Sequence, residues 1–130
     1  MRALRRAQRS LPATRTALLP DGPVEYLAAG HGLPSIVALS GLNMPLKTWA
    51  LVFEELAETS TVFVYNRLGV GVGVGVGVGV GASAAPSRPQ TGTAIVDLLR
   101  VALEAADVQA PYVLVGHQRG RVTRPCDATV

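Results

Sequence analysis

The sequence predicts an α/β fold built around a parallel sheet, and two observations support this prediction. Three short, continuous apolar runs are spaced along the chain, at residues 36–39, 62–65 and 112–115. Two longer stretches with helical periodicity lie between them, at residues 45–59 and 93–108. Strands that alternate with helices are joined by right-handed crossovers into a parallel sheet, and such strands are buried on both faces. The predicted order is therefore β-α-β-α-β, preceded by a β-hairpin.

The hairpin is predicted from the first apolar segments. Residues 15–19 and 24–28 are short and apolar, and Pro20-Asp21-Gly22-Pro23 separates them. Two prolines with fixed φ angles on either side of a glycine favour a tight turn. The two segments should therefore pair as antiparallel strands. A second turn, at residues 30–34, then leads into the first strand of the parallel sheet.

The two helices are predicted from their apolar stripes. In residues 45–59, Pro45 suits the first helical position, where its missing N–H costs nothing. In residues 93–108, Thr93 is the candidate N-cap, because its hydroxyl can accept a free N–H of the first turn. Apolar residues recur at helical spacing in both segments, and charged residues lie mostly off the stripe.

Composition limits the classes of function. The 130 residues suffice for one domain, and the net charge of +3 is uneven. Residues 1–20 carry five Arg and no acid, whereas residues 21–118 carry eight acids and four bases. A mildly acidic body argues against a nucleic-acid-binding face. No apolar run approaches the ~18 residues of a membrane span, so neither nucleic acid nor membrane is expected as a partner.

Cysteine and histidine usage argues against metal sites. The single Cys126 excludes an internal disulfide, and two separated histidines leave no metal-ligand cluster, so we expect no metal and no cofactor. The Arg-rich start has no apolar segment typical of a secretory signal. A transit peptide shares its composition, but a disordered basic N-terminus at residues 1–14 and a cytoplasmic location are favoured. Residues 15–120 form the domain, and residues 121–130 an irregular tail.

A strict Gly-Val alternation occupies residues 69–81. A dinucleotide-binding fingerprint needs a glycine at i+5, but every odd step from a glycine here reaches a valine. A nucleotide-binding loop is therefore not favoured. A strand is also disfavoured, because repeated glycines carry high backbone entropy and leave one face without side chains. We interpret the run as a flexible or loosely β-prone loop.

The last apolar run leads into the motif Gly-His-Gln-Arg-Gly. Gly116 and Gly120 lie two residues before and two residues after Gln118. Glycines at these positions permit a tight turn from a strand into a helix, where a Cβ would collide. This motif resembles the nucleophile elbow of the α/β-hydrolase family, in which the central residue is normally Ser.

Two further segments resemble the same family, and the resemblance covers residues 24–120. Residues 36–41 are similar to the strand that leads into the oxyanion loop, with Ser40 where the family has His. The sequence Tyr-Asn-Arg-Leu-Gly-Val-Gly from residue 65 is similar to a Tyr-Asp-Arg pattern, with Asn66 in place of Asp. Removal of residues 72–81 would complete that pattern, so these ten residues are interpreted as an expansion loop.

The resemblance implies a partial α/β-hydrolase fold and an ancestral activity. Family members of this kind cleave carbonyl-centred, ester-type bonds, so a small ester-like molecule is the implied ligand. By analogy, the backbone N–H groups of Leu42 and Arg119 would form the oxyanion hole. Gln118 occupies the nucleophile position. A carboxamide has no proton of useful pKa, so this residue is not competent as a nucleophile.

The residues after the elbow also argue against activity. In this family the catalytic acid and base follow the nucleophile along the chain, but residues 121–130 contain Asp127 and no His. We therefore expect a truncated, inactive serine hydrolase. The alternatives are a small non-catalytic α/β binding module and a gene remnant with a frameshifted tail. Without later strands, residues 112–115 should form an open sheet edge through which the chain self-associates.

Overall fold

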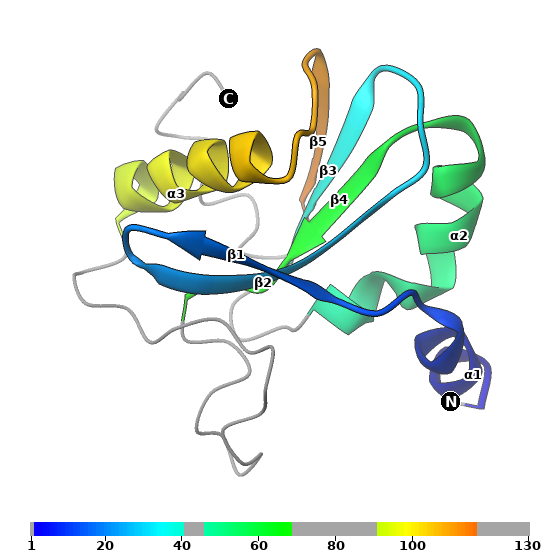
Figure 1. Cartoon of the computed structure of the whole chain (residues 1–130). Helices are drawn as coiled ribbons and strands as arrows, with labels where there is room; N and C mark the ends of the chain where they lie inside the picture. The colour runs from blue at the N-terminus through cyan, green and yellow to red at the C-terminus, as the bar shows by residue number, and fades with distance from the viewer. Residues whose placement is uncertain (1, 41–45, 69–90, 117–130) are drawn as a thin grey trace, which may run out of the picture.

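A computed structural model describes residues 2–40, 46–68 and 91–116 and shows one sheet with helices on both faces (Figure 1). The strands are β1 (Arg15–Leu19), β2 (Gly22–Ala29), β3 (Ser35–Leu39), β4 (Val62–Tyr65) and β5 (Tyr112–Gly116). The helices are α1 (Arg2–Ser10), the 3-10 helix η1 (Leu46–Trp49), α2 (Ala50–Thr59) and α3 (Gly92–Ala105). The predicted hairpin and the β-α-β-α-β order that follows it are both confirmed.

The described residues form a sheet of five strands in the order β1-β2-β4-β3-β5. The hairpin strands β1 and β2 are antiparallel, and β2 pairs antiparallel with β4. Strand β3 lies between β4 and β5 and is parallel to both, with Ile36 opposite Val62 on one side and Val113 on the other. The three continuous apolar runs are therefore adjacent in one layer, as the sequence predicts.

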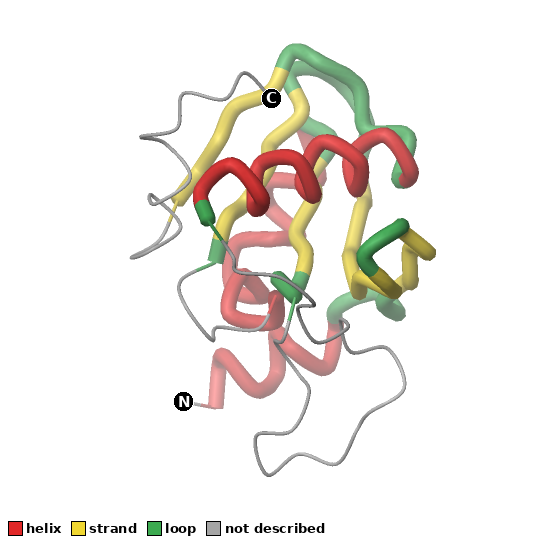
Figure 2. Tube along the Cα trace, turned by 90° about the vertical axis from the view of Figure 1, so that its left-hand side faces the viewer, coloured by secondary structure: helices red, strands yellow, loops and turns green. Residues whose placement is uncertain are grey.

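Two apolar clusters hold the layers together. The larger one lies between the sheet and α3 and includes Val37, Phe63 and Leu99, each less than 1% exposed. The other lies between the sheet and α2 and includes Phe53 and Val64. Figure 2 shows α3 in front of the strands and the other helices behind them. Successive residues of β3 and β4 thus face different helices, which explains why these strands are continuous apolar runs.

The ends of α3 differ from the prediction at both termini. The N-cap is Thr91 rather than Thr93, because the extended Thr91 lets its hydroxyl accept the Ala94 N–H at 3.1 Å. The helix ends at Ala105 rather than at residue 108. There Asp107 takes a left-handed φ of 56°, and the Val108 N–H turns back to the Leu103 carbonyl at 2.9 Å.

The helix predicted at residues 45–59 begins as a 3-10 turn. Pro45 lies outside the described residues, Leu46–Trp49 form η1, and regular α-helix starts at Ala50. Trp49 provides no side-chain cap for α2, because its indole N–H can only donate and a cap must accept a backbone N–H. The predicted apolar stripe is only partly buried. Phe53 is 2% exposed, whereas Val52 is 40% exposed.

The disorder expected at residues 1–14 is corrected by the structure, because Arg2–Ser10 form the helix α1. Ala, Leu, Arg and Gln have high helix propensity, but a helix this short needs tertiary contacts. Those contacts come from α2 and its surroundings. Leu11 packs against the cluster under α2, and the Gln8 side chain donates to the Lys47 carbonyl at 3.3 Å.

The turn between β2 and β3 explains one glycine of the sequence. Gly30 has a φ of +80°, and a Cβ at this position would lie 2.2 Å from the Ser60 carbonyl oxygen. No side chain fits there without moving the backbone after α2. This close approach brings the end of α2 against the start of β3 and so sets the first β-α-β unit.

Candidate functional site

The predicted elbow begins where β5 ends. Gly116 is the last residue of β5 and lies opposite Leu39, the last residue of β3. The other predicted site residues, Leu42, Gln118, Arg119 and Gly120, lie outside the described residues. The structure therefore confirms the strand that leads to the elbow, while the turn itself stays a prediction.

The carboxyl ends of β3 and β4 meet at the same edge of the sheet as Gly116. Ala38 is opposite Val64 and Leu39 is opposite Gly116, so Ser40 and Asn66 follow their strands at the same level. In open α/β sheets, ligands bind at the carboxyl ends of the strands. This edge is the candidate site, because three segments that carry candidate motifs end there.

Ser40 is held by a tryptophan. It is 2% exposed, and its hydroxyl accepts the Trp49 indole N–H at 3.0 Å. Trp49 itself packs against the cluster under α2, as expected of a core residue, and also carries this polar contact. The hydroxyl of Ser40 is thus engaged in fixing the end of β3 to η1.

Asn66 joins three parts of the chain. Its side-chain oxygen accepts the backbone N–H of Leu46 at 2.6 Å, and its side-chain nitrogen donates to the Glu25 carboxylate. The other Glu25 oxygen accepts the Thr14 hydroxyl at 2.9 Å. An Asp in place of Asn66 would set a second carboxylate against Glu25, so the amide suits this environment.

Sequence reasoning identified Asn66 but missed Glu25. The signal was present, because Glu25 is the only charged residue in the otherwise apolar β2. A lone acid in a strand that the fold half buries needs a hydrogen-bonding partner. The antiparallel pairing of β2 with β4, which the sequence did not predict, supplies that partner by placing Glu25 beside Asn66.

The two anchors lie on either side of the predicted oxyanion loop. Ser40 precedes residues 41–45 and is bonded to Trp49, while Leu46 follows them and is bonded to Asn66. The bond to Leu46 is buried and the bond to Ser40 is partly buried, and such hydrogen bonds contribute about 0.5–1.5 kcal/mol each. The ends of the segment are therefore fixed by side chains that the body of the domain orients.

Tyr65 is the buried ionisable group nearest this edge. Its ring stacks on Phe63 with centroids 5.8 Å apart, and its hydroxyl has no hydrogen-bonding partner among the described residues. Burial raises the pKa of the Tyr65 phenol to about 12, and the nearby charge of Arg67 opposes the rise. The phenol is therefore neutral at physiological pH and is not a general base.

The described residues contain no group of three His, Cys, Asp or Glu side chains arranged to hold a metal ion. A hollow of about 420 Å³ lies beside Tyr112 and the end of α3. Because Tyr112 is opposite Ser35, this hollow is at the amino ends of the strands, away from Gly116. It is not the predicted hydrolase site.

No helix in the described part of the chain is long and apolar enough to span a membrane.

No family model matches the sequence, and no curated protein matches it. Similarity is found among solved structures. An enol-lactonase from Burkholderia xenovorans is 21% identical, with a TM-score of 0.67, over 84% of this chain and 39% of that one. An alpha/beta hydrolase fold protein from Burkholderia ambifaria is 20% identical, with a TM-score of 0.67, over 87% and 37%. The Cif epoxide hydrolase from Acinetobacter nosocomialis is 14% identical, with a TM-score of 0.69, over 95% and 38%.

The chain therefore spans somewhat less than two fifths of the length of these proteins, from 37% to 39%. At such low identity the similarity concerns the fold. The sheet order, the antiparallel hairpin and the parallel strands agree with it. The described chain has a partial α/β-hydrolase fold.

Proposed function

We propose that this chain is a member of the α/β-hydrolase family, descended from a serine hydrolase of ester-type bonds, and that it does not hydrolyse esters itself. The supporting observation is the register at the carboxyl edge of the sheet, where Ser40 follows β3, Asn66 follows β4 and Gly116 ends β5. These are the positions from which the family resemblance expects the oxyanion loop, the Tyr-Asp-Arg segment and the elbow.

The chemistry at the elbow is the reason to expect no hydrolysis. Gln118 follows Gly116 by two residues, where an ester hydrolase of this family has its nucleophile. Its amide nitrogen is delocalised into the carbonyl and cannot attack an ester carbon. The hydroxyl of Ser40 does not replace it, because this hydroxyl is buried and engaged with Trp49.

Carbonyl binding is the part of the function that this chain could retain. The proposed donors, the backbone N–H groups of Leu42 and Arg119, do not depend on side-chain identity. Anchors at Ser40 and Leu46 support the first of these donors by fixing both ends of its loop. The proposed ligand is accordingly a small ester-like molecule that binds without being cleaved.

An ester-cleavage assay with p-nitrophenyl acetate tests the proposal. Wild type, Gln118→Ser and Gln118→Ala should all release nitrophenolate at the same background rate, because neither variant restores a general base. Wild-type turnover above background that Gln118→Ala abolishes would show a catalytic Gln118 and overturn the proposal. Strong activity of Gln118→Ser would show that a base is present after all and that only the nucleophile is missing.

A further inference from the structure

A groove between α1 and α2 carries opposite charges on its two walls. Its volume is about 680 Å³, within the range of ligand-binding clefts. Arg2 and Arg6, one helical turn apart, lie on the α1 wall, and Glu54 and Glu55 lie on the α2 wall. The groove is separate from the carboxyl edge of the sheet.

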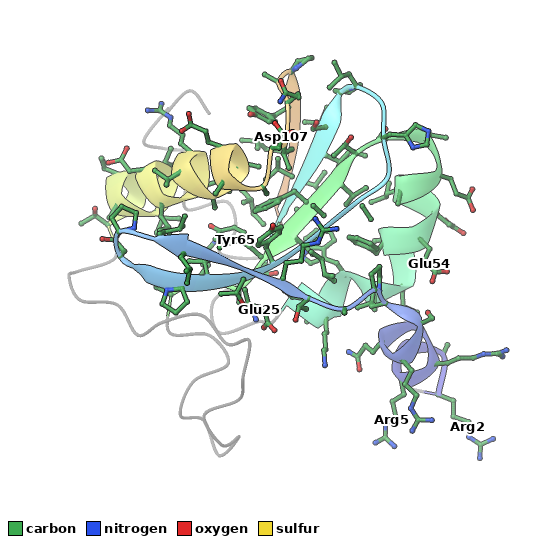
Figure 3. The ribbon with its side chains drawn as sticks, in the orientation of Figure 1. Arg2, Arg5, Glu25, Glu54, Tyr65 and Asp107 are labelled. Atoms are coloured by element: carbon green, nitrogen blue, oxygen red, sulfur yellow. The ribbon has the colours of Figure 1, made fainter. Side chains whose placement is uncertain are left out.

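The charges on the two walls are not joined in ion pairs across the groove. All four side chains are exposed, and among the described residues none of them takes part in an ion pair within 4.0 Å. Figure 3 shows Arg2 extending from α1 into solvent, away from the body of the domain and from Glu54 on α2. The walls thus present two unpaired rows of opposite sign.

The α1 wall is electrostatically unfavourable on its own. Arg2 and Arg6 repel each other at i, i+4, and Arg2 lies in the first turn, where the helix dipole favours acids. α1 has no acidic residue in that turn to offset this. Carboxylates brought by a partner would offset this repulsion and interact favourably with the first turn of α1.

Apolar side chains also line the groove. Ala7 is half-buried on α1, and Leu51 is 57% exposed on α2. Small side chains allow helices to approach within about 8–10 Å, and an exposed leucine gains by being covered. A third helix lying along the groove would cover Leu51 and place its two edges beside the two charged walls.

We propose that this groove binds an amphipathic helix of a partner protein. The helix would have an apolar seam on Ala7 and Leu51, an acidic edge along Arg2 and Arg6, and a basic edge along Glu54 and Glu55. In coiled coils, complementary charges on either side of an apolar seam select the partner helix in the same way. A nucleic acid or an anionic membrane fits less well, because either would meet the glutamate wall.

A labelled probe peptide tests the proposal by fluorescence anisotropy. The probe is a helix with a leucine seam, glutamates along one edge and lysines along the other, and it is titrated with the full chain. Its affinity should fall at least about tenfold in Arg2→Glu/Arg6→Glu and, separately, in Glu54→Lys/Glu55→Lys. The α2 variant does not alter α1, so it tests the groove even if the first variant undocks α1.

Arg5→Glu/Arg9→Glu is the matched control, since it makes the same charge change on α1 at positions that do not line the groove. It should change the affinity by less than about threefold. An equal loss in this control, or an unchanged affinity in Glu54→Lys/Glu55→Lys, would overturn the proposal. Tighter binding of an all-glutamate peptide, duplex DNA or anionic phosphatidylserine vesicles would overturn it as well, because these fit a basic surface alone.

Discussion

β4 and β5 have similar apolar sequences but very different surroundings. β4 lies between β2 and β3 with helices on both faces, and each of its residues is at most 1% exposed. β5 pairs only with β3 among the described strands, and Val113, Leu114 and Val115 are 44%, 43% and 37% exposed. An apolar run thus specifies that a segment is a strand, while its neighbours decide whether the apolar surface is covered.

The largest loss of stability is expected for a substitution in β4. Phe63→Ala removes a fully buried ring that stacks on Tyr26 and Tyr65, and should lower the free energy of unfolding by about 3–5 kcal/mol. Leu114→Ala in β5 should cost only about 1 kcal/mol, because less apolar area is lost from the interior. Urea unfolding curves compare the two. Similar losses would mean that β5 is covered as completely as β4.

The next largest loss of stability is expected at Asn66, which follows β4. Asn66→Asp keeps the bond to the Leu46 N–H but sets a carboxyl against Glu25, and should cost about 1–3 kcal/mol at pH 7. The neighbouring carboxylate would raise the pKa of the introduced group in the folded state. The stability lost at pH 7 should therefore return as the pH falls toward about 4. Asn66→Ala, followed by the same urea titrations, should show a loss without this pH dependence.

Tyr65→Phe should have a smaller effect and the opposite sign. The hydroxyl has no partner among the described residues, so its removal should be neutral or stabilise the fold by up to about 1–3 kcal/mol. Because the folded pKa of about 12 exceeds the unfolded value of 10.0, wild type should lose stability as the pH rises from 10 to 12.

Tyr65→Phe should lack this alkaline loss. Phenolate absorbance near 295 nm, followed with pH, checks the assignment. A wild-type titration complete at pH 10 to 11 would contradict a buried Tyr65.

The smallest effect on stability, within about 0.5 kcal/mol, is expected at the exposed edge. We expect the side of β5 that no described strand covers to pair with β5 of another copy, so Val113→Lys should shift the protein toward monomer in sedimentation velocity. Val101→Lys on α3 is the matched control, because Val101 is 39% exposed and lies away from the edge. A wild type that is monomeric at all concentrations would contradict this expectation.

The sequence predicted the strands better than the ends of the helices. Residues 62–65 were predicted as a strand with the observed bounds, because a continuous apolar run is a strong signal. Thr91 and Thr93 both carry a hydroxyl that can cap a helix. Only the backbone conformation, which is extended at Thr91, decides which of them does so. α1 was missed because a short helix depends on contacts with α2 that lie far away in sequence.

The motifs of the candidate site lie at the ends of three predicted strands, and the observed register brings Ser40, Asn66 and Gly116 to one edge of the sheet. The roles assigned to the site residues stay predictions. The hydrogen bond from Asn66 to Glu25 could not be predicted, because it depends on β2 pairing with β4 rather than with β3. The chemistry of Gln118 rests on the sequence alone.

The central position of β3 has a consequence for the slow exchange of its amides with deuterium. The Ser35 N–H donates to the Pro111 carbonyl on the β5 side at 2.9 Å, and the Ile36 N–H donates to the Thr61 carbonyl on the β4 side at 2.7 Å. In a strand with parallel neighbours, successive amides point to opposite sides. Odd and even residues of one short strand can thus report separately on the detachment of each neighbour.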